Sequence, residues 1–407
     1  MSVCKMEDKE KENNEMQGIW KKISIFLLMM LLVSVSGCGI TSKEKQEEIA
    51  AEKKEKLVIW AYYETQAQRS GLDELVKNFN QSQNQYEAEW EYVPMTGFVK
   101  GLSSAYTENK LPDMAILDNP DTPSLIQLGM FEDITEQVEN WNLEEEYYPS
   151  ILGTVKYEDR YYGLPLNCNS TALFYNKEIL KEAGVTPPSD WEELHEAANK
   201  LTAGKRNGFL MCSMEGEQGA FQILPWILSA GGTIDEIEGR PWEETYKFFS
   251  EMLKDNSMSE NCINLTQTDV AREFIEGKAA MMQNGPWVLP MLEEAGTEYG
   301  IVPLPKKKFC AAVLGGENIT IVKGKNVEGS LKFLNFCMEG EELIQFCESA
   351  SILPAKISAA KKMAAEDENM KVFEEQMNYA VSRTSVPQWE TIAQKLTDRM
   401  YNLVQED

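Results

Sequence analysis

The sequence has little of the chemistry on which metal sites and histidine-dependent enzymes rely. It contains a single histidine, His195, in the segment WEELHEAANKL, on the solvent-facing side of a predicted helix. One such residue cannot build a zinc site of several histidines or a Ser-His-Asp triad. The eight cysteines form no Cys-x-x-Cys pair. We therefore expect no metal centre, no cofactor and no catalytic residue of these kinds.

Basic residues and nucleotide-binding loops are also lacking. The chain has 39 lysines and arginines against 66 acidic residues, a net charge of −27. A nucleic-acid-binding protein needs a basic face, so we expect no nucleic-acid partner. The segments GVTPPS and LGGEN lack the glycine spacing and the lysine of phosphate-binding loops. Strong acidity favours solubility and weak self-association, which is typical of a monomer.

No long apolar run is present that could cross a membrane. The run at 23–33 has eleven residues, whereas a bilayer core of roughly 30 Å needs about 20 residues of helix. Two lysines precede it and small residues follow, so residues 1–37 are predicted to be a signal peptide. The first twenty residues carry five acids against three lysines, which favours a translation start at Met16.

The end of this segment, Val35-Ser36-Gly37-Cys38, resembles a bacterial lipobox. In a lipobox the cysteine is acylated and becomes the mature N-terminus, so Cys38 is the predicted lipidation site. Several acyl chains on one residue anchor a protein firmly. We expect attachment to the extracytoplasmic face of the cell membrane, through a polar tether over residues 38–56.

Six further cysteines lie far apart in the chain, and their connectivity cannot be read from spacing. An exported chain of this size can build a core without disulfides, so free and mostly buried thiols are expected. This usage is typical of an anaerobic or poorly oxidising niche. The six are Cys168, Cys212, Cys262, Cys310, Cys337 and Cys347.

The mature chain of about 370 residues is larger than one hydrophobic core usually serves, so two lobes are expected. Strand-like and helix-like segments alternate from KLVIWAYYE onward. In GLDELVKNFNQ, for example, Leu72, Leu75, Val76 and Phe79 share one helical face. Alternation of this kind predicts open α/β sheets, whose ligands bind beyond the carboxyl ends of the strands.

A tryptophan follows a strand end in EGKAAMMQNGPWVLP, residues 276–290. The strand must stop at Asn284-Gly285-Pro286, because glycine favours a turn and proline lacks the N–H. Trp287 is therefore expected at a strand edge or loop mouth. Such a position suits a ligand contact, but the side chain could equally fill the core.

Seven segments in this order resemble the family 1 extracellular solute-binding proteins, the maltose-binding type that serves bacterial ABC importers. They are KLVIW, LPDMAILDN, YGLPLNCNSTALFYNKEIL, ILPWILSAGG, FIEGKAAMMQNGPW, AAVLGGENITI and ILPAK. The resemblance implies two α/β lobes with the solute in the cleft between them. Lobe one is then 57–166 with 315–352, lobe two is 167–312 with 356–407, and the hinges lie near 165–169, 310–314 and 351–355.

The resemblance also implies a set of binding residues. Asn169 stands in the segment where the maltose-binding branch carries a glutamate, which argues against maltose itself. Asp118 could merely cap the next helix, and Phe221, Trp226 and Trp389 could lie in the core. The ligand-binding residues so predicted are Glu64, Thr65, Asp118, Asn119, Asn169, Phe221, Trp226, Trp287 and Trp389.

The implied function is reversible capture of a carbohydrate and its delivery to ABC permease subunits by hinge closure, without chemistry on the ligand. Two other functions remain open. One is a glycoside hydrolase with two catalytic carboxylates, although 66 acidic residues would place some pair at any cleft. The other is a solute-binding co-receptor for a sensor kinase.

Overall fold

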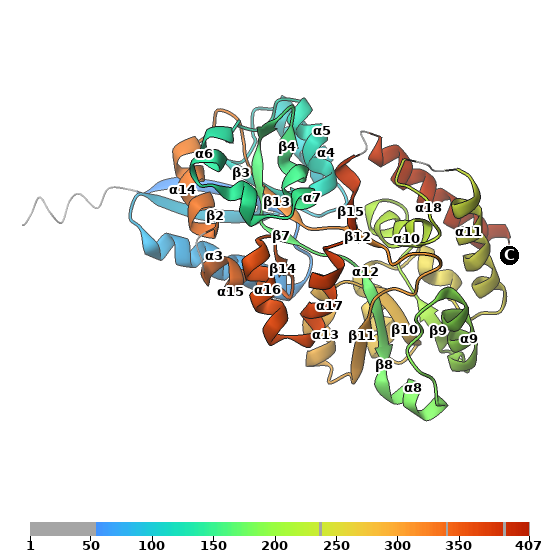
Figure 1. Cartoon of the computed structure of the whole chain (residues 1–407). Helices are drawn as coiled ribbons and strands as arrows, with labels where there is room; N and C mark the ends of the chain where they lie inside the picture. Colours follow the sequence, from blue (N-terminus) through green and yellow to red (C-terminus); the bar gives the residue numbers. More distant parts are fainter. Residues whose placement is uncertain (1–53, 236–237, 339–340, 386–387, 407) are drawn as a thin grey trace, which may run out of the picture. The chain divides into compact units, whose positions relative to one another are not determined.

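The computed structural model describes residues 54–235, 238–338, 341–385 and 388–406. The predicted signal peptide, lipidation site and most of the tether lie outside these residues. Two separate sheets organise the described chain (Figure 1). We refer to each sheet with its covering helices as a lobe.

The sheet of lobe one has the strand order β2-β1-β3-β13-β6. The first three of these strands are parallel, and β13 is antiparallel to both β3 and β6. Because β1 and β3 are parallel neighbours, their carboxyl ends lie at the same edge of the sheet. The strands are β1 Glu55–Ala61, β2 Tyr86–Tyr92, β3 Met114–Asp118, β6 Gly163–Pro165 and β13 Glu317–Ile321.

Helices cover the two faces of this sheet. On one face, Phe79 packs edge-to-face on Phe333 with ring centroids 4.9 Å apart; on the other, Phe98 and Leu102 pack into a separate apolar cluster with Leu117. The helices are α3 Gln66–Ser82, α4 Phe98–Thr107, α5 Thr122–Gln127, α6 Thr135–Asn140, α7 Pro149–Leu152, α14 Val327–Met338 and α15 Glu341–Ala350.

The sheet of lobe two has the order β11-β8-β10-β9, with β10 parallel to β9 and antiparallel to β8. Its strands are β8 Ala172–Asn176, β9 Asn207–Leu210, β10 Ala279–Asn284 and β11 Tyr299–Val302. Its helices are α8 Lys177–Ala183, α9 Trp191–Leu201, α10 Glu217–Ser229, α11 Arg240–Lys254, α12 Gln267–Ile275, α13 Leu289–Glu294, α16 Ile357–Glu366, α17 Glu368–Gln376 and α18 Trp389–Glu406.

Short strand pairs join the lobes where the chain passes between the two sheets. Strand β7 (Asn167–Cys168) pairs with β14 (Leu353–Pro354), and β12 (Ala312–Leu314) pairs with β15 (Ala380–Ser382). Strands β7, β12 and β14 lie within the three segments predicted as hinges, whereas β15 lies outside them. The hinge motion and the lobe boundaries themselves stay predictions.

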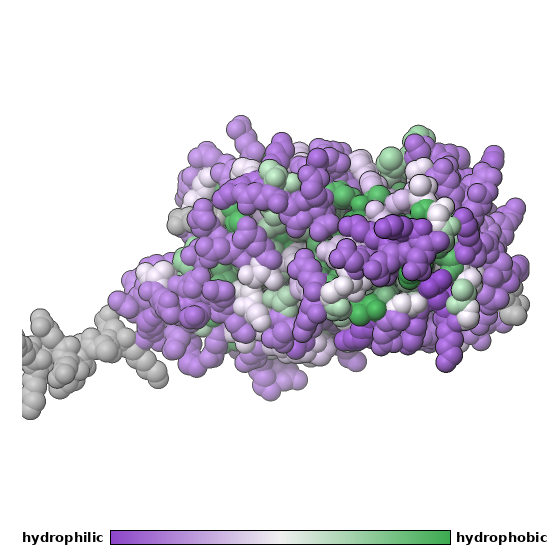
Figure 2. Space-filling model, turned by 90° about the horizontal axis from the view of Figure 1, so that it is seen from below, coloured by the Kyte–Doolittle hydropathy of each residue, from purple (hydrophilic) through white to green (hydrophobic). Residues whose placement is uncertain are grey.

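Figure 2 shows a mainly hydrophilic face, on which hydrophobic residues gather in recesses. Of the described cysteines, five are buried and Cys310 is exposed, and all six are free thiols. Within the described ranges, the helices are too short or too polar to cross a membrane.

Candidate functional site

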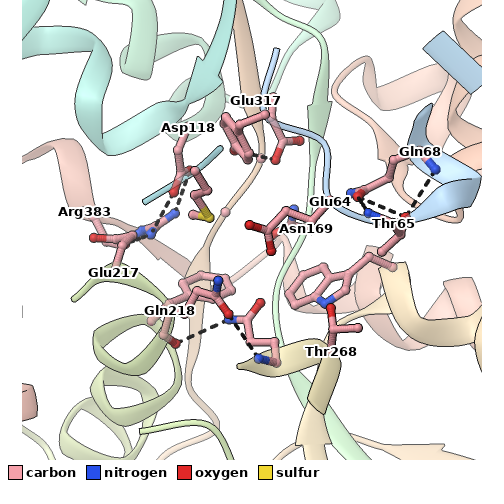
Figure 3. A pocket seen from close by; sticks show the side chains of 17 residues that line it. Glu64, Thr65, Gln68, Asp118, Asn169, Glu217, Gln218, Thr268, Glu317 and Arg383 are labelled. Atoms are coloured by element: carbon pink, nitrogen blue, oxygen red, sulfur yellow. Dashed lines mark hydrogen bonds and ion pairs between the residues drawn. The ribbon is translucent and has the colours of Figure 1, made fainter. Parts of the chain in front are cut away.

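A cavity of about 80 Å³ lies between the lobes, with room for several water molecules. Lobe one supplies the loop after β1, the end of β3 and the start of β13. Lobe two supplies the first turns of α10 and α12 and the short turn η5 (Pro286–Val288) after β10. Figure 3 shows these side chains converging on one space. The cavity thus lies beyond the carboxyl ends of β1, β3 and β10, where open α/β sheets bind ligands.

Six of the nine predicted binding residues line the cavity, and their binding role stays a prediction. They are Glu64, Thr65, Asp118, Asn169, Phe221 and Trp287. Thr65 is already engaged, because it is the N-cap of α3 in a capping box with Gln68. Its hydroxyl lies 3.0 Å from Gln68 Oε1, so a ligand would have to compete for this group.

Trp287 owes its position to the turn that ends β10. Its indole folds back over Gly285, where a Cβ would lie 2.0 Å from the ring. Asn284 secures the same turn, since its Nδ2 donates to the carbonyl of Gln267 at 2.8 Å. The indole lies 6.3 Å from the ring of Phe221 and is 8% exposed. Trp287 therefore lines the cavity and packs against its neighbours at the same time.

The glycines Gly315 and Gly316 let two parts of the cavity wall approach each other closely. A Cβ on Gly315 would lie 2.0 Å from Asn169 Oδ1 and 2.8 Å from the Phe221 ring. Gly316 has φ +128°, a conformation that other residues rarely adopt. These two glycines bring the backbone before Glu317 against Asn169 and Phe221.

Arg383 is the main electrostatic feature of the cavity and was not predicted from the sequence. It begins the turn η6 (Arg383–Ser385) after β15 and is 1% exposed. Its Nη2 donates to Asp118 Oδ1 of lobe one at 3.1 Å, and its Nη1 donates to Glu217 of lobe two. The guanidinium also lies 4.5 Å from the centre of the Phe221 ring. Arg383 therefore connects the two lobes beside the cavity (Figure 3).

Burial and the mutual interactions of Arg383 and the nearby carboxyl groups shift the pKa values of these residues. Burial alone would lower the pKa of Arg383, but Asp118 and Glu217 outweigh this effect and hold the pKa above its usual value. Burial raises the pKa of Asp118, and Arg383 opposes that shift. Burial, followed by repulsion from Glu217, raises the pKa of Asp121 to about 7. Arg383 is thus a permanent cation among carboxyl groups that are costly to ionise.

Glu317 is a second buried carboxyl on the cavity wall. It is 6% exposed, and its Oε1 accepts a hydrogen bond from the Tyr62 hydroxyl at 2.7 Å. Its other oxygen, Oε2, is buried and has no hydrogen-bond partner. Burial raises the pKa of Glu317, whereas Tyr62 and Asn167 oppose that shift.

Three predicted binding residues lie outside the cavity lining. Asn119 is buried behind Asp118, and its Oδ1 accepts from Arg383 Nη2 at 3.3 Å. Trp389 donates its indole N–H to Glu217 at 2.7 Å, so it supports a lining residue. Trp226 needs correction, because it is 1% exposed in the aromatic core of lobe two, 5.8 Å from the Trp191 ring. Its indole N–H donates a hydrogen bond to Gln283 Oε1.

Much of the polar lining was missed by the sequence analysis. Amide and hydroxyl groups come from the starts of three helices, and Gln218 Oε1 accepts from the backbone N–H of Gln267 at 3.0 Å, which ties α10 to α12. Only the Gly-Gly-Glu run offered a signal, since paired glycines mark close backbone approach. The missed lining residues are Tyr62, Gln68, Met95, Glu217, Gln218, Gln267, Thr268, Gly315, Gly316, Glu317 and Arg383.

Comparison with known proteins adds family evidence to this geometry. A family model described as bacterial extracellular solute-binding protein matches residues 74–372. A Brucella abortus protein named as a binding protein is 23% identical over 347 residues, which cover 82% of this chain and 84% of that protein. A multiple sugar-binding protein of Streptococcus mutans is 22% identical, and the match covers 81% of this chain and 79% of that protein.

A solved structure shares the fold. It is an ABC transporter solute-binding protein of Thermotoga lettingae bound with α-D-tagatose, with a TM-score of 0.80 and 23% identity. The match covers 87% of this chain and 95% of that one. The predicted α/β fold with two lobes is thereby confirmed.

Proposed function

Since the chain belongs to the bacterial extracellular solute-binding proteins, we propose that it captures a sugar or oligosaccharide between its lobes and delivers it to the permease subunits of an ABC transporter. In this proposal it works as a monomer on the extracytoplasmic face of the cell membrane, anchored through a lipid on Cys38. The protein performs no chemistry on its ligand.

The composition of the cavity wall carries this proposal. A sugar presents apolar C–H faces and a rim of hydroxyl groups. Trp287 and Phe221 offer aromatic surface, and Asn169, Gln218 and Gln267 offer amide donors and acceptors beside the carboxylates. Polar groups placed around an aromatic surface orient such ligands in protein pockets.

The position of the wall residues suits a hinge mechanism. Glu64 and Asp118 belong to lobe one, whereas Gln218 and Trp287 belong to lobe two. A ligand favours the closed arrangement only through contacts that the open arrangement lacks. A solute touching both walls meets this condition. The sugar-binding protein of S. mutans and the tagatose-bound protein of T. lettingae are relatives consistent with a carbohydrate ligand.

Two of the four carboxylates in the cavity lining are unsuited to hydrolysis. Asp118 and Glu217 both bind Arg383, so the guanidinium occupies the oxygens that this pair would need as acid and nucleophile. Glycoside hydrolysis requires two carboxyl groups free to act on the glycosidic bond. Incubation with oligosaccharides should therefore leave them intact, and release of shorter products would support the enzyme instead.

A thermal-shift screen against sugars, followed by small-angle scattering, tests the proposal. A sugar at 100 times its dissociation constant should add about 2.7 kcal/mol of stability. Scattering should then show compaction on binding. Thr268→Ala, on the cavity wall, should weaken binding. Gln394→Ala, at an exposed position of α18 outside the cavity, is the matched control. Absence of a shift with every sugar, or binding without compaction, would contradict the proposal.

A further inference from the structure

The wall of the cavity carries more carboxyl groups than its single guanidinium can pair. Four carboxyl groups line it, those of Glu64, Asp118, Glu217 and Glu317, against the guanidinium of Arg383. All three nitrogens of that guanidinium are engaged. Nε donates to the Leu314 carbonyl at 3.2 Å, and the other two donate to the side chains described above. Arg383 is thus committed to its own cluster.

The charge of Arg383 opposes the effect of burial on the pKa of Glu317, but one oxygen of this carboxylate has no hydrogen-bond partner. The partners of Glu317 are the Tyr62 hydroxyl at Oε1 and, for its backbone N–H, Asn167 Oδ1 at 3.4 Å. Oε2 remains unpartnered in a side chain that is 94% buried on the cavity wall, since the residue is 6% exposed. Burying a carboxylate without compensation is costly. A group that both donates a hydrogen bond and carries positive charge satisfies this oxygen better than a neutral hydroxyl.

The rest of the wall fits a small hydroxylated cation. Trp287 presents an aromatic surface, which attracts cations as well as sugar C–H faces. The amides of Asn169 and Gln218 suit hydroxyl groups. An anionic solute such as a phosphate ester would face the carboxylate excess and be repelled.

Resting on the proposed sugar-binding function, we propose that the solute is an amino sugar, whose ammonium group pairs with the carboxylate of Glu317 while its hydroxyl groups meet the amide side chains. The ammonium supplies the positive charge that the lining lacks. The ring lies against the indole of Trp287.

The test compares sugars that differ in one group. Isothermal titration of the purified protein uses glucosamine, N-acetylglucosamine and glucose, the galactose series, and the corresponding β-1,4-linked glucose disaccharides with amine, acetamide or hydroxyl at C2. The amine should bind at least tenfold more tightly than the hydroxyl or acetamide analogue of the same skeleton. Equal or tighter binding of the uncharged analogues would overturn the proposal and leave sugar capture intact. No binding by any of these sugars would overturn the amino-sugar proposal, whereas the wider thermal-shift screen decides the proposed sugar-binding function separately.

Two variants test whether the carboxylate of Glu317 is the group that binds the ammonium. Glu317→Gln keeps an oxygen for the Tyr62 hydroxyl but removes the carboxylate, so it should weaken amine binding at least tenfold and weaken binding of the hydroxyl analogue by a clearly smaller factor. Glu215→Gln is the matched control: it lies just before α10 outside the lining, and its bond to Gln394 can persist. It should leave both affinities unchanged.

Two further results would refute the ammonium assignment. One is an equal loss of amine and hydroxyl analogue in Glu317→Gln. The other is a Glu317-dependent rise in melting temperature on adding calcium chloride alone, which would make the missing partner a metal ion. Wild-type protein serves in the sugar comparison, so that part of the test stands even if the variant folds poorly.

Discussion

Replacing Arg383 by methionine should destabilise the protein strongly. The variant keeps a long apolar stem but removes the cation that is 1% exposed between Asp118 and Glu217. Removing one member of a buried ion pair typically costs about 3–5 kcal/mol, because the other charge stays buried without compensation. Two carboxylates lose their partner here, so we expect the upper part of that range at pH 8.

The cost should depend on pH in a defined direction. Without the guanidinium, nothing opposes the effect of burial on the pKa of Asp118, which therefore rises further. Between about pH 4, the pKa of an unfolded aspartate, and this raised value, the native state binds more protons than the unfolded state. Stability then falls as pH rises. The deficit relative to wild type should accordingly be smaller at pH 5.5 than at pH 8.

Urea unfolding at both pH values, followed by tryptophan fluorescence, measures these differences. The control is the double variant Arg383→Met with Asp118→Asn, in which the carboxylate of Asp118 is removed together with the guanidinium that it binds. It should recover part of the stability lost in the single variant. A deficit below about 1 kcal/mol at pH 8, or equal deficits at both pH values, would refute the idea that Arg383 compensates buried carboxylates.

Three other outcomes follow from the same features. Trp287→Ala should weaken sugar binding by about 1–3 kcal/mol. Because the side chain is only 8% exposed, the same change should also lower stability by about 3–5 kcal/mol. Titration measures the affinity and urea unfolding the stability, and unchanged affinity per folded molecule would assign Trp287 to the core alone. Asp121, with a pKa raised to about 7, contributes stability that is present below about pH 4 and lost as pH rises through 7. Asp121→Asn should therefore raise the melting temperature over wild type at pH 8, by an amount that shrinks towards pH 5, and a constant difference would contradict this. Cys38→Ser should leave the protein unprocessed or released in cell fractions, and a processed, membrane-bound variant would disprove lipidation there.

The sequence predicts the strand and helix order well, because local spacing encodes which face of an element is buried. In α3 the four residues expected on one face, Leu72, Leu75, Val76 and Phe79, are all buried. The end of β10 was predictable for a similar reason, since Asn-Gly-Pro cannot extend a strand. Both features depend on residues a few positions apart.

Trp226 shows where such local evidence stops. It lies five positions after Phe221 on α10, so the two side chains point about 140° apart around the helix. Both are buried, because α10 is covered on almost every side. A helix that is apolar all round carries no periodic signal for the side that meets a cavity. Only the packing of α10 against β9 and α11 places Trp226 in the core and leaves Phe221 on the wall.

The cluster around Arg383 could not be predicted because topology alone assembles it. Asp118 ends a strand of lobe one, Glu217 begins a helix of lobe two about a hundred residues later, and Arg383 follows β15, which pairs with a strand joining the lobes. These three residues bind one another across the cavity through contacts of the protein itself. A solute therefore stabilises this arrangement only by contacts additional to theirs. In the proposed hinge mechanism, weakening the cluster of Asp118, Glu217 and Arg383 should therefore make closure depend more strongly on the solute.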